Sequence, residues 1–239
     1  DWAFTDCTNL TTVTVYASTP PSLGYRAFNY CTSLANIYVF SDYMDTYKGA
    51  ANWIAYKDII KGFGYCGATG HETDVVWVLS GTSPNYTLTI MKVGETGAMA
   101  DFGSYYNIPW ESNSNNITSV IIEDGVTNIG GIAFKNQQNL TSITIANSVT
   151  TIGKYAFQKC SGLTEFTVPD GVTEIKEAAF DQCSNMETFN ISTGLATIDN
   201  NGIFWNCNNL ATFTVAAGNT AVKAEDDVLL TDDGKELVA

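Results

Sequence analysis

Apolar and polar residues alternate in short stretches that recur along the chain. The segments "LTSITI" (140–145), "LTEFTV" (163–168), "METFNI" (186–191) and "LATFTV" (210–215) have apolar residues at their first, fourth and sixth positions. Their third and fifth positions are mostly polar or small. Alternation with a period of two residues is typical of a β-strand that buries one face. We therefore expect one short strand in each of these segments.

An aromatic residue, a cysteine and an aliphatic residue precede these strands at nearly constant spacing. The segment "FQKCSGL" (157–163) recurs 23 residues later as "FDQCSNM" and, after 24 more, as "FWNCNNL". The aromatic anchors of the whole series are Phe4, Phe28, Phe134, Phe157, Phe180 and Phe204. A period this short predicts a solenoid, in which each repeat buries its apolar face against the next one.

The remainder of each repeat is also regular. A turn follows the strand, then an apolar pair such as Val172 and Ile175, and then a segment such as "GKYAFQKC" (153–160). We expect this last segment to form one short helical or 3₁₀ turn at the corner of the repeat. The predicted fold is a repeat solenoid of mostly short parallel β-strands with short helical or 3₁₀ turns.

Two stretches interrupt the repeats and suggest three domains. Residues 1–64 form a partial N-terminal repeat block that ends in an amphipathic helical pattern at 41–62. Residues 65–111 contain two strand-like runs around a turn cluster at 81–85, which predicts a β-hairpin. Residues 112–239 form a second repeat block that ends in a truncated repeat. Because terminal repeats must cover an open apolar face and a strand edge, we expect the helical segment and the hairpin to act as caps.

The repeats resemble the BspA-type leucine-rich repeats of bacterial cell-surface proteins. The segment "LTEFTVPDGVTEIKEAAFDQC" (163–183) matches that pattern almost position by position, with Lys176 in place of the usual Gly, and "LTSITIANSVTTIGKYAFQKC" (140–160) also fits. The resemblance covers almost the whole chain. It implies a right-handed leucine-rich-repeat superhelix and a surface-exposed binding or adhesion role, and it supplies no catalytic residues.

Composition narrows the classes of function. The 239 residues carry a formal net charge of −14 with only 11 Lys and Arg, which argues against nucleic acid as a partner. No apolar run approaches the roughly 20 residues of a membrane-spanning helix, so we expect no membrane insertion by this chain. The chain opens inside a repeat, and we expect it to be a piece of a longer exported protein, located outside the cell or at its surface.

Six cysteines in an exported protein raise the possibility of disulfides. All but Cys66 occupy the same position of the repeat, where one repeat has Gln137 instead. Parallel Cβ vectors on stacked repeats would hold these Cβ atoms too far apart for a disulfide. We therefore predict buried free thiols at this position, and the state of Cys66 is left open. The five repeat cysteines are Cys7, Cys31, Cys160, Cys183 and Cys207.

The sequence predicts no catalytic, cofactor or metal site. His71, Glu72 and Asp74 lie in one Gly-rich loop, where spacing alone does not bring them together, so a solvated loop is favoured over a triad or a metal site. Zinc is disfavoured because the chain has a single His and no C-x-x-C pair. Three acidic pairs fall at turns, where Asp is common for backbone reasons, and they lack the ligand spacing of a calcium site. These pairs are Glu123–Asp124, Asp226–Asp227 and Asp232–Asp233.

The outward positions of successive strands form the candidate ligand-binding surface, which we call the strand face. Its residues are Ser142, Thr144, Glu165, Thr167, Thr188, Asn190, Thr212 and Thr214. One interpretation is a polar surface that binds a protein or glycan of a host or neighbouring cell. The other is that Thr simply favours strands and pairs well across them. The leading functional hypothesis is accordingly a non-catalytic recognition or adhesion module, and the alternative is a spacer that projects another domain.

Overall fold

The computed structural model describes residues 2–225 and 228–231, and the chain divides into two compact units. Unit 1 comprises Asp1–Gly64 and Val78–Ser80, and unit 2 comprises Tyr65–Trp77 and Gly81–Ala239. The predicted division into three parts, with a separate connector at 65–111, stays a prediction. The right-handed superhelix and the capping roles of the helical segment and the hairpin also stay predictions.

Unit 1 contains three parallel strands, β1 (Thr12–Val15), β2 (Asn36–Phe40) and β3 (Ile60–Tyr65). Val13 pairs with Ile37, and Ile37 pairs with Ile60, so the repeats are aligned on their buried positions. Between β2 and β3 lie the 3₁₀ helix η1 (Ser41–Tyr43), the helix α1 (Met44–Gly49) and the 3₁₀ helix η2 (Ile54–Tyr56). Short helices therefore occur where the sequence predicts them, and they bury Tyr47 and Trp53 against each other.

The segment at 75–92 contains the two strands that the sequence predicts. β4 (Val75–Thr82) and β5 (Asn85–Lys92) are adjacent strands joined by Ser83 and Pro84. The 3₁₀ helices η3 (Tyr105–Asn107) and η4 (Glu111–Asn116) follow and lead into the second series of repeats.

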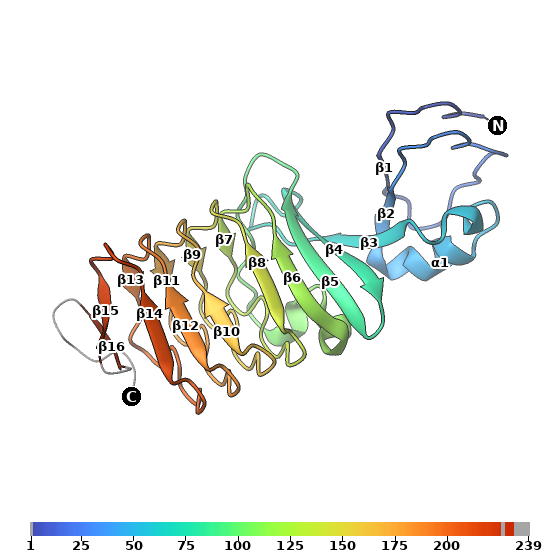
Figure 1. Ribbon diagram of the computed structural model, residues 1–239. Helices are drawn as coiled ribbons and strands as arrows, with labels where there is room; N and C mark the ends of the chain where they lie inside the picture. Colours follow the sequence, from blue (N-terminus) through green and yellow to red (C-terminus); the bar gives the residue numbers. More distant parts are fainter. Residues whose placement is uncertain (1, 226–227, 232–239) are drawn as a thin grey trace. The chain divides into compact units, whose positions relative to one another are not determined.

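The repeats of unit 2 form two rows of parallel strands (Figure 1). The first row contains β6 (Ile117–Ile122), β8 (Ser142–Ile145), β10 (Glu165–Thr167), β12 (Thr188–Ile191) and β14 (Thr212–Val215). The second row contains β7 (Asn128–Ile129), β9 (Thr151–Ile152), β11 (Glu174–Ile175) and β13 (Thr197–Ile198). Paired residues lie one repeat apart, as in Ser119 with Ser142 and Asn128 with Thr151. An antiparallel pair follows, β15 (Val222–Glu225) and β16 (Val228–Thr231).

The first row of strands is interrupted between β8 and β10, which belong to separate sheets. At the end of the neighbouring strands, the backbone N–H of Ala146 donates to the carbonyl oxygen of Ile122, and that of Ala216 donates to Ile191. Pro169 occupies the equivalent position after β10 and has no N–H to donate. The bond that would join this end of β10 to β8 therefore cannot form.

The corners of the repeats are consecutive turns, not the helical or 3₁₀ turns that the sequence predicts. Two residues of each corner have a left-handed backbone, one two positions before the anchor Phe and one two positions after it. Around Phe157 these are Tyr155 (φ 57°) and Lys159 (φ 63°). The corners also bond to one another, because the N–H of Phe157 donates to the carbonyl oxygen of Ala179 at 2.8 Å and that of Phe180 donates to Ile203 at 3.1 Å. A helical turn would use these groups within its own repeat.

The anchor phenylalanines form one interior column in unit 2. Ring centroids of Phe134 and Phe157 lie 5.3 Å apart, those of Phe157 and Phe180 also 5.3 Å, and those of Phe180 and Phe204 6.0 Å. Trp110 extends the column, since its ring stacks on Phe134 at 5.7 Å. The prediction that successive repeats seal each other's apolar faces is confirmed for this unit.

The repeat cysteines are free thiols, as predicted, but the prediction that they are buried is wrong for Cys7, which is exposed, and for Cys31, which is only partly buried, because these repeats of unit 1 are less covered by neighbours. Cys160, Cys183 and Cys207 are buried, and each thiol donates to the carbonyl oxygen of the anchor Phe one repeat earlier at 3.0–3.2 Å. Burial raises the pKa of the Cys160 thiol, so it stays protonated as a donor. Cys66, whose state the sequence left open, is also free and buried, and burial raises its pKa too.

Gln137 replaces this cysteine in one repeat and is fully buried. Neither its amide nitrogen nor its amide oxygen has a hydrogen-bond partner among the described residues. An unpaired buried amide costs about 1–3 kcal/mol. We expect Gln137→Met, which keeps the side-chain length, to raise the free energy of unfolding by roughly that amount. Thermal and urea unfolding measure it, with the exposed neighbour Gln138→Met as control. A less stable Gln137→Met protein would show that the amide is satisfied.

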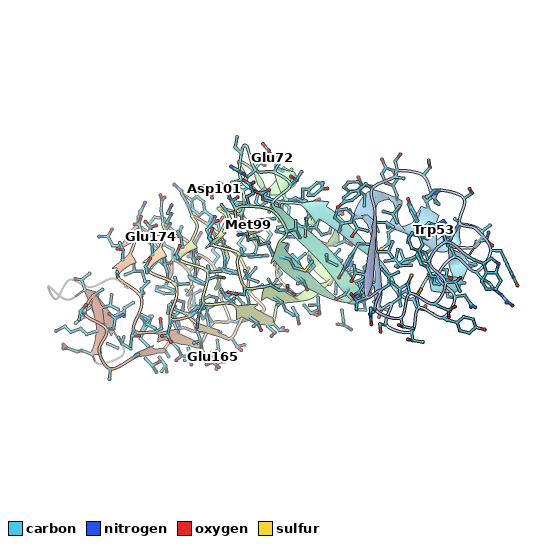
Figure 2. The ribbon with its side chains drawn as sticks, turned by 90° about the horizontal axis from the view of Figure 1, so that it is seen from above. Trp53, Glu72, Met99, Asp101, Glu165 and Glu174 are labelled. Carbon is cyan, nitrogen blue, oxygen red and sulfur yellow. The ribbon has the colours of Figure 1, made fainter. Side chains whose placement is uncertain are left out.

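One edge of the second row of strands is covered by the segment that precedes it. The side-chain amide of Asn128 in β7 accepts a hydrogen bond from the N–H of Met99 at 2.8 Å and donates one to its carbonyl oxygen at 3.1 Å. Asp101 accepts from the N–H of Gly131 at 2.6 Å, and Figure 2 shows Met99 and Asp101 on the same side of the unit. These contacts satisfy the backbone N–H and carbonyl groups of Met99 and the N–H of Gly131, which lies two residues after β7.

Candidate functional site

The strand face lies along the outward side of the first row of strands, away from the second row. Figure 2 shows Glu165 of β10 and Glu174 of β11 on opposite sides of unit 2. Register aligns the strand-face residues in two columns across β10, β12 and β14. The columns are Glu165–Thr188–Thr212 and Thr167–Asn190–Thr214.

Two predicted residues are not part of these columns. Ser142 and Thr144 lie on β8, where they pair with Ser119 and Ile121 of β6 and not with β10. Ile121, which shares a column with Thr144, is 36% exposed. The structure therefore brings six of the eight predicted residues together, and the interruption after β8 separates the other two from them.

The side chains of the strand face bond mainly to one another. The amide nitrogen of Asn190 donates to a carboxylate oxygen of Glu165 at 2.7 Å and to the hydroxyl of Thr167 at 3.2 Å. The hydroxyl of Thr214 donates to the amide oxygen of Asn190. A ligand that binds here must compete with these bonds, although water already does so at an exposed surface.

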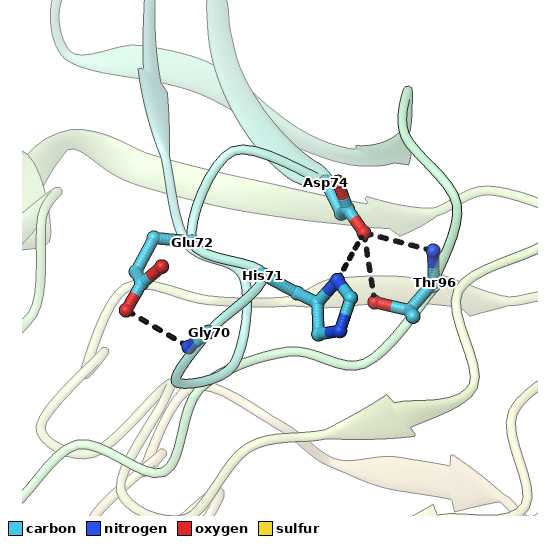
Figure 3. Close-up of polar contacts among 5 residues, drawn as sticks. All are labelled: Gly70, His71, Glu72, Asp74 and Thr96. Atoms are coloured by element: carbon cyan, nitrogen blue, oxygen red, sulfur yellow. Dashed lines mark hydrogen bonds and ion pairs between the residues drawn. The ribbon is translucent and has the colours of Figure 1, made fainter.

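The acidic side chains of the His71 loop accept hydrogen bonds from nearby backbone N–H groups (Figure 3). His71 Nδ1 lies 3.0 Å from a carboxylate oxygen of Asp74, and the same oxygen accepts from the N–H and the hydroxyl of Thr96 at 2.9 and 3.1 Å. Glu72 instead accepts from the N–H of Gly70 at 3.0 Å. The three residues named by the sequence analysis therefore do not converge on a common point, although His71 and Asp74 are in contact.

The same hydrogen bonds shift the pKa values of the carboxylates in this loop. The N–H of Thr96 is the main reason that the pKa of Asp74 lies below its usual value, and His71 adds to it. The N–H of Gly70 lowers the pKa of Glu72 in the same way. Hydrogen bonds to a carboxylate favour its charged form. Both carboxylates are thus held ionised as acceptors for the backbone, which is a structural role.

Among residues 2–225 and 228–231, no group of three or more His, Cys, Asp or Glu side chains is placed to hold a metal ion. Asp226, Asp227, Asp232 and Asp233, two of the acidic pairs considered above, lie outside the described residues. No helix within the described part of the chain is long and apolar enough to cross a membrane.

A second polar surface, which the repeat pattern did not predict, lies at the corners of the repeats. An open groove of about 580 Å³, which we call the corner groove, runs across these corners. Its lining residues are Gln138, Lys159, Ser161, Gln182, Ser184, Asn206 and Asn208. Each directly precedes or follows the cysteine position of its repeat, so the fixed spacing was the signal that could have revealed them.

The carboxylate of Asp181 is buried beside the corner groove. It accepts hydrogen bonds from the side-chain amides of Gln158, Gln182 and Asn206, the last two at 3.0 and 3.4 Å. A buried carboxylate without such donors would be costly. Asp181 therefore fixes the amides that reach it.

The repeats match the model of a known protein family. The model of the BspA type leucine rich repeat region matches residues 1–51 and 112–225, with six copies. The chain belongs to the BspA-type leucine-rich repeat family. Repeats of this family and fold are in general not enzymatic.

Solved structures of other bacterial leucine-rich repeat proteins are similar to this chain. A leucine-rich repeat protein from Eubacterium ventriosum is 27% identical with a TM-score of 0.54 over 71% of this chain. The chain spans 48% of that protein's length. A leucine rich cell surface protein from Faecalibacterium prausnitzii is 18% identical with a TM-score of 0.46, covering 90% of this chain and 62% of that one. The comparison with curated proteins gave no match.

Proposed function

We propose that this BspA-type leucine-rich repeat chain is a non-catalytic recognition or adhesion module of an exported, cell-surface protein. Its ligand is a protein or glycan of a host or neighbouring cell, bound through the strand face. The observation that carries the proposal is the register that lines up Thr, Asn and Glu side chains across β10, β12 and β14, exposed on β10 and β14 and partly exposed on β12. A repeating row of donors and acceptors suits an extended ligand.

The expected affinity per site is modest. The strand face has no Trp, Tyr or Arg among its predicted residues, and such anchors supply most of the free energy in tight protein interfaces. Several copies of the module on one cell surface would raise the overall avidity, because each bound copy increases the effective concentration of ligand near the others.

A spacer that projects another domain is the second candidate. The specific observation in its favour is that Asn190 bonds to Glu165, Thr167 and Thr214, so these side chains already satisfy one another. A spacer needs only this mutual pairing, which stabilises neighbouring strands.

Arginine substitutions on the strand face separate the two candidates. We expect the triple variant Thr167→Arg, Thr212→Arg, Thr214→Arg to lose at least about tenfold in affinity, because long charged side chains block the polar columns at a cost of about 1.4 kcal/mol or more. Pull-downs against extracellular matrix proteins and a glycan array measure binding of the full chain.

The matched control carries the same added charge on the other side of unit 2. Thr150→Arg, Thr173→Arg and Thr197→Arg replace exposed threonines beside or within the second row of strands. Binding that survives in this control and is lost in the strand-face triple supports recognition. Equal binding by the strand-face triple and the unsubstituted chain contradicts it, and a complete lack of ligands favours the spacer.

A further inference from the structure

The corner groove has the chemistry of a carbohydrate site. Its lining residues offer side-chain amides, hydroxyls and one ammonium group, and they include no aliphatic or aromatic side chain. Amides and hydroxyls both donate and accept hydrogen bonds, as sugar hydroxyls do. A peptide ligand would instead need an apolar pocket for its anchoring side chain.

The amides of the groove are held in place before any ligand arrives. Gln182 and Asn206 both use an amide N–H to bond to the buried carboxylate of Asp181. Their amide oxygens are then left as acceptors with a defined position. Such preorganisation lowers the entropic cost of binding. This arrangement differs from the strand face, where the polar side chains bond across the surface to each other.

Rows of like residues run through the groove at the spacing of the repeats. Gln138, Ser161, Ser184 and Asn208 form one row, and Lys159, Gln182 and Asn206 form the other. Neighbouring parallel strands lie about 4.8 Å apart, a distance similar to the rise of one sugar ring in an extended polysaccharide. A polymer of sugars could therefore meet an equivalent polar group at each repeat.

The charge of the chain favours uncharged over anionic polysaccharides as ligands of the groove. Lys159 is the one charged residue among those lining the groove, and the whole chain carries a net charge of −14. This field repels polyanions such as uronic acid polymers. Trp205 directly precedes the lining residue Asn206 and is 60% exposed, but its ring covers Gly202 and does not line the groove.

We propose that the corner groove is a binding site for an uncharged polysaccharide, distinct from the strand face. The site uses the amides fixed by Asp181, the exposed amides of Gln138 and Asn208, and the hydroxyls of Ser161 and Ser184, and it makes no use of the strand-face columns.

Affinity electrophoresis of the full chain tests this site. Native gels contain one soluble uncharged polysaccharide each, namely mannan, dextran, xyloglucan or hydroxyethylcellulose, and mobility is compared with a gel without polysaccharide. The groove is blocked by Ser161→Arg with Ser184→Arg. A second variant, Gln138→Ala with Asn208→Ala, removes two exposed amides without adding bulk or charge, so the test survives if the first variant misfolds. Thr144→Arg with Thr167→Arg is the charge-matched control on the strand face.

We expect at least one polysaccharide to retard the unsubstituted chain, and both groove variants to lose about tenfold or more in apparent affinity. The strand-face control should be retarded like the unsubstituted chain. The site is overturned if no polysaccharide retards the chain, or if groove variants that fold bind like the unsubstituted chain. Loss of retardation in the strand-face control alone would overturn this site while supporting the strand-face proposal.

Discussion

Phe180→Ala is expected to lower the free energy of unfolding by about 3–5 kcal/mol, the range for deleting a fully buried phenyl ring. Phe180 has no exposed surface and contacts the rings of four other phenylalanines. Those rings belong to Phe157, Phe166, Phe189 and Phe204, with centroids 4.6–6.0 Å away. Removal of the ring leaves a cavity that borders three repeats. The neighbouring side chains cannot fill it, because each is already close-packed within the stack. Urea unfolding followed by circular dichroism measures the loss.

Phe4→Ala is the matched control for this change. Phe4 occupies the same position of a repeat, but it is 47% exposed and stacks on Phe28 alone among the anchor rings. We expect a loss of about 1–2 kcal/mol, since roughly half of its surface is already in water. Equal losses in the two variants would mean that the interior column does not stabilise the fold.

Gly171→Ala is expected to lower the free energy of unfolding by about 1–3 kcal/mol, because a Cβ at this turn overpacks the contact between repeats. The added carbon would collide with the backbone carbonyl of Asn147 in the preceding repeat. Gly194 meets the backbone of Asp170 in the same way, so the close approach recurs along the stack. Backbone cannot yield to a methyl group as a flexible side chain can. Urea unfolding again gives the value.

Gly103→Ala provides the comparison within unit 2. A Cβ at Gly103 meets nothing within 4 Å, and the residue does not need a left-handed backbone. We expect this change to be neutral or to stabilise by about 0.4–1 kcal/mol, because alanine restricts the unfolded chain. If Gly171→Ala proves as harmless as Gly103→Ala, the repeats do not approach each other as closely as described.

Contacts between residues at equivalent positions of successive repeats could be predicted from the sequence. The spacing of Phe157, Phe180 and Phe204 predicted a single column because residues one repeat apart must face each other once strands pair in register. The same logic predicted free thiols at Cys160 and Cys183, which donate to backbone carbonyls. Register therefore connects the linear pattern to contacts in three dimensions.

Features that depend on backbone conformation were not predictable in this way. Tyr155 and Lys159 adopt left-handed conformations with no Gly or Asn to signal them, so the corner was wrongly predicted as helical. Pro169 did carry a signal for the interruption between β8 and β10, since proline cannot donate to a ladder.

In the candidate sites too, residues that follow the strand alternation were predictable and residues in turns were not. Alternation predicted which strand residues point outward, and register placed six of the eight together, but hydrogen bonding among them was not visible in the sequence. The corner groove was missed because its residues lie in turns, where alternation carries no information. Asp181 was missed because nothing in its sequence context distinguishes a buried carboxylate from a solvated one.

The most direct measurement of the stacked arrangement is a pair of double-mutant cycles on the Phe column. One cycle combines Phe157→Leu with Phe180→Leu, whose rings are 5.3 Å apart, and the other combines Phe134→Leu with Phe204→Leu, which two repeats separate. Stacking of successive repeats predicts a coupling of about 0.5–1.5 kcal/mol in the first cycle. It predicts additivity to within about 0.5 kcal/mol in the second. Additivity in the first cycle, or coupling of equal size in both, would contradict it.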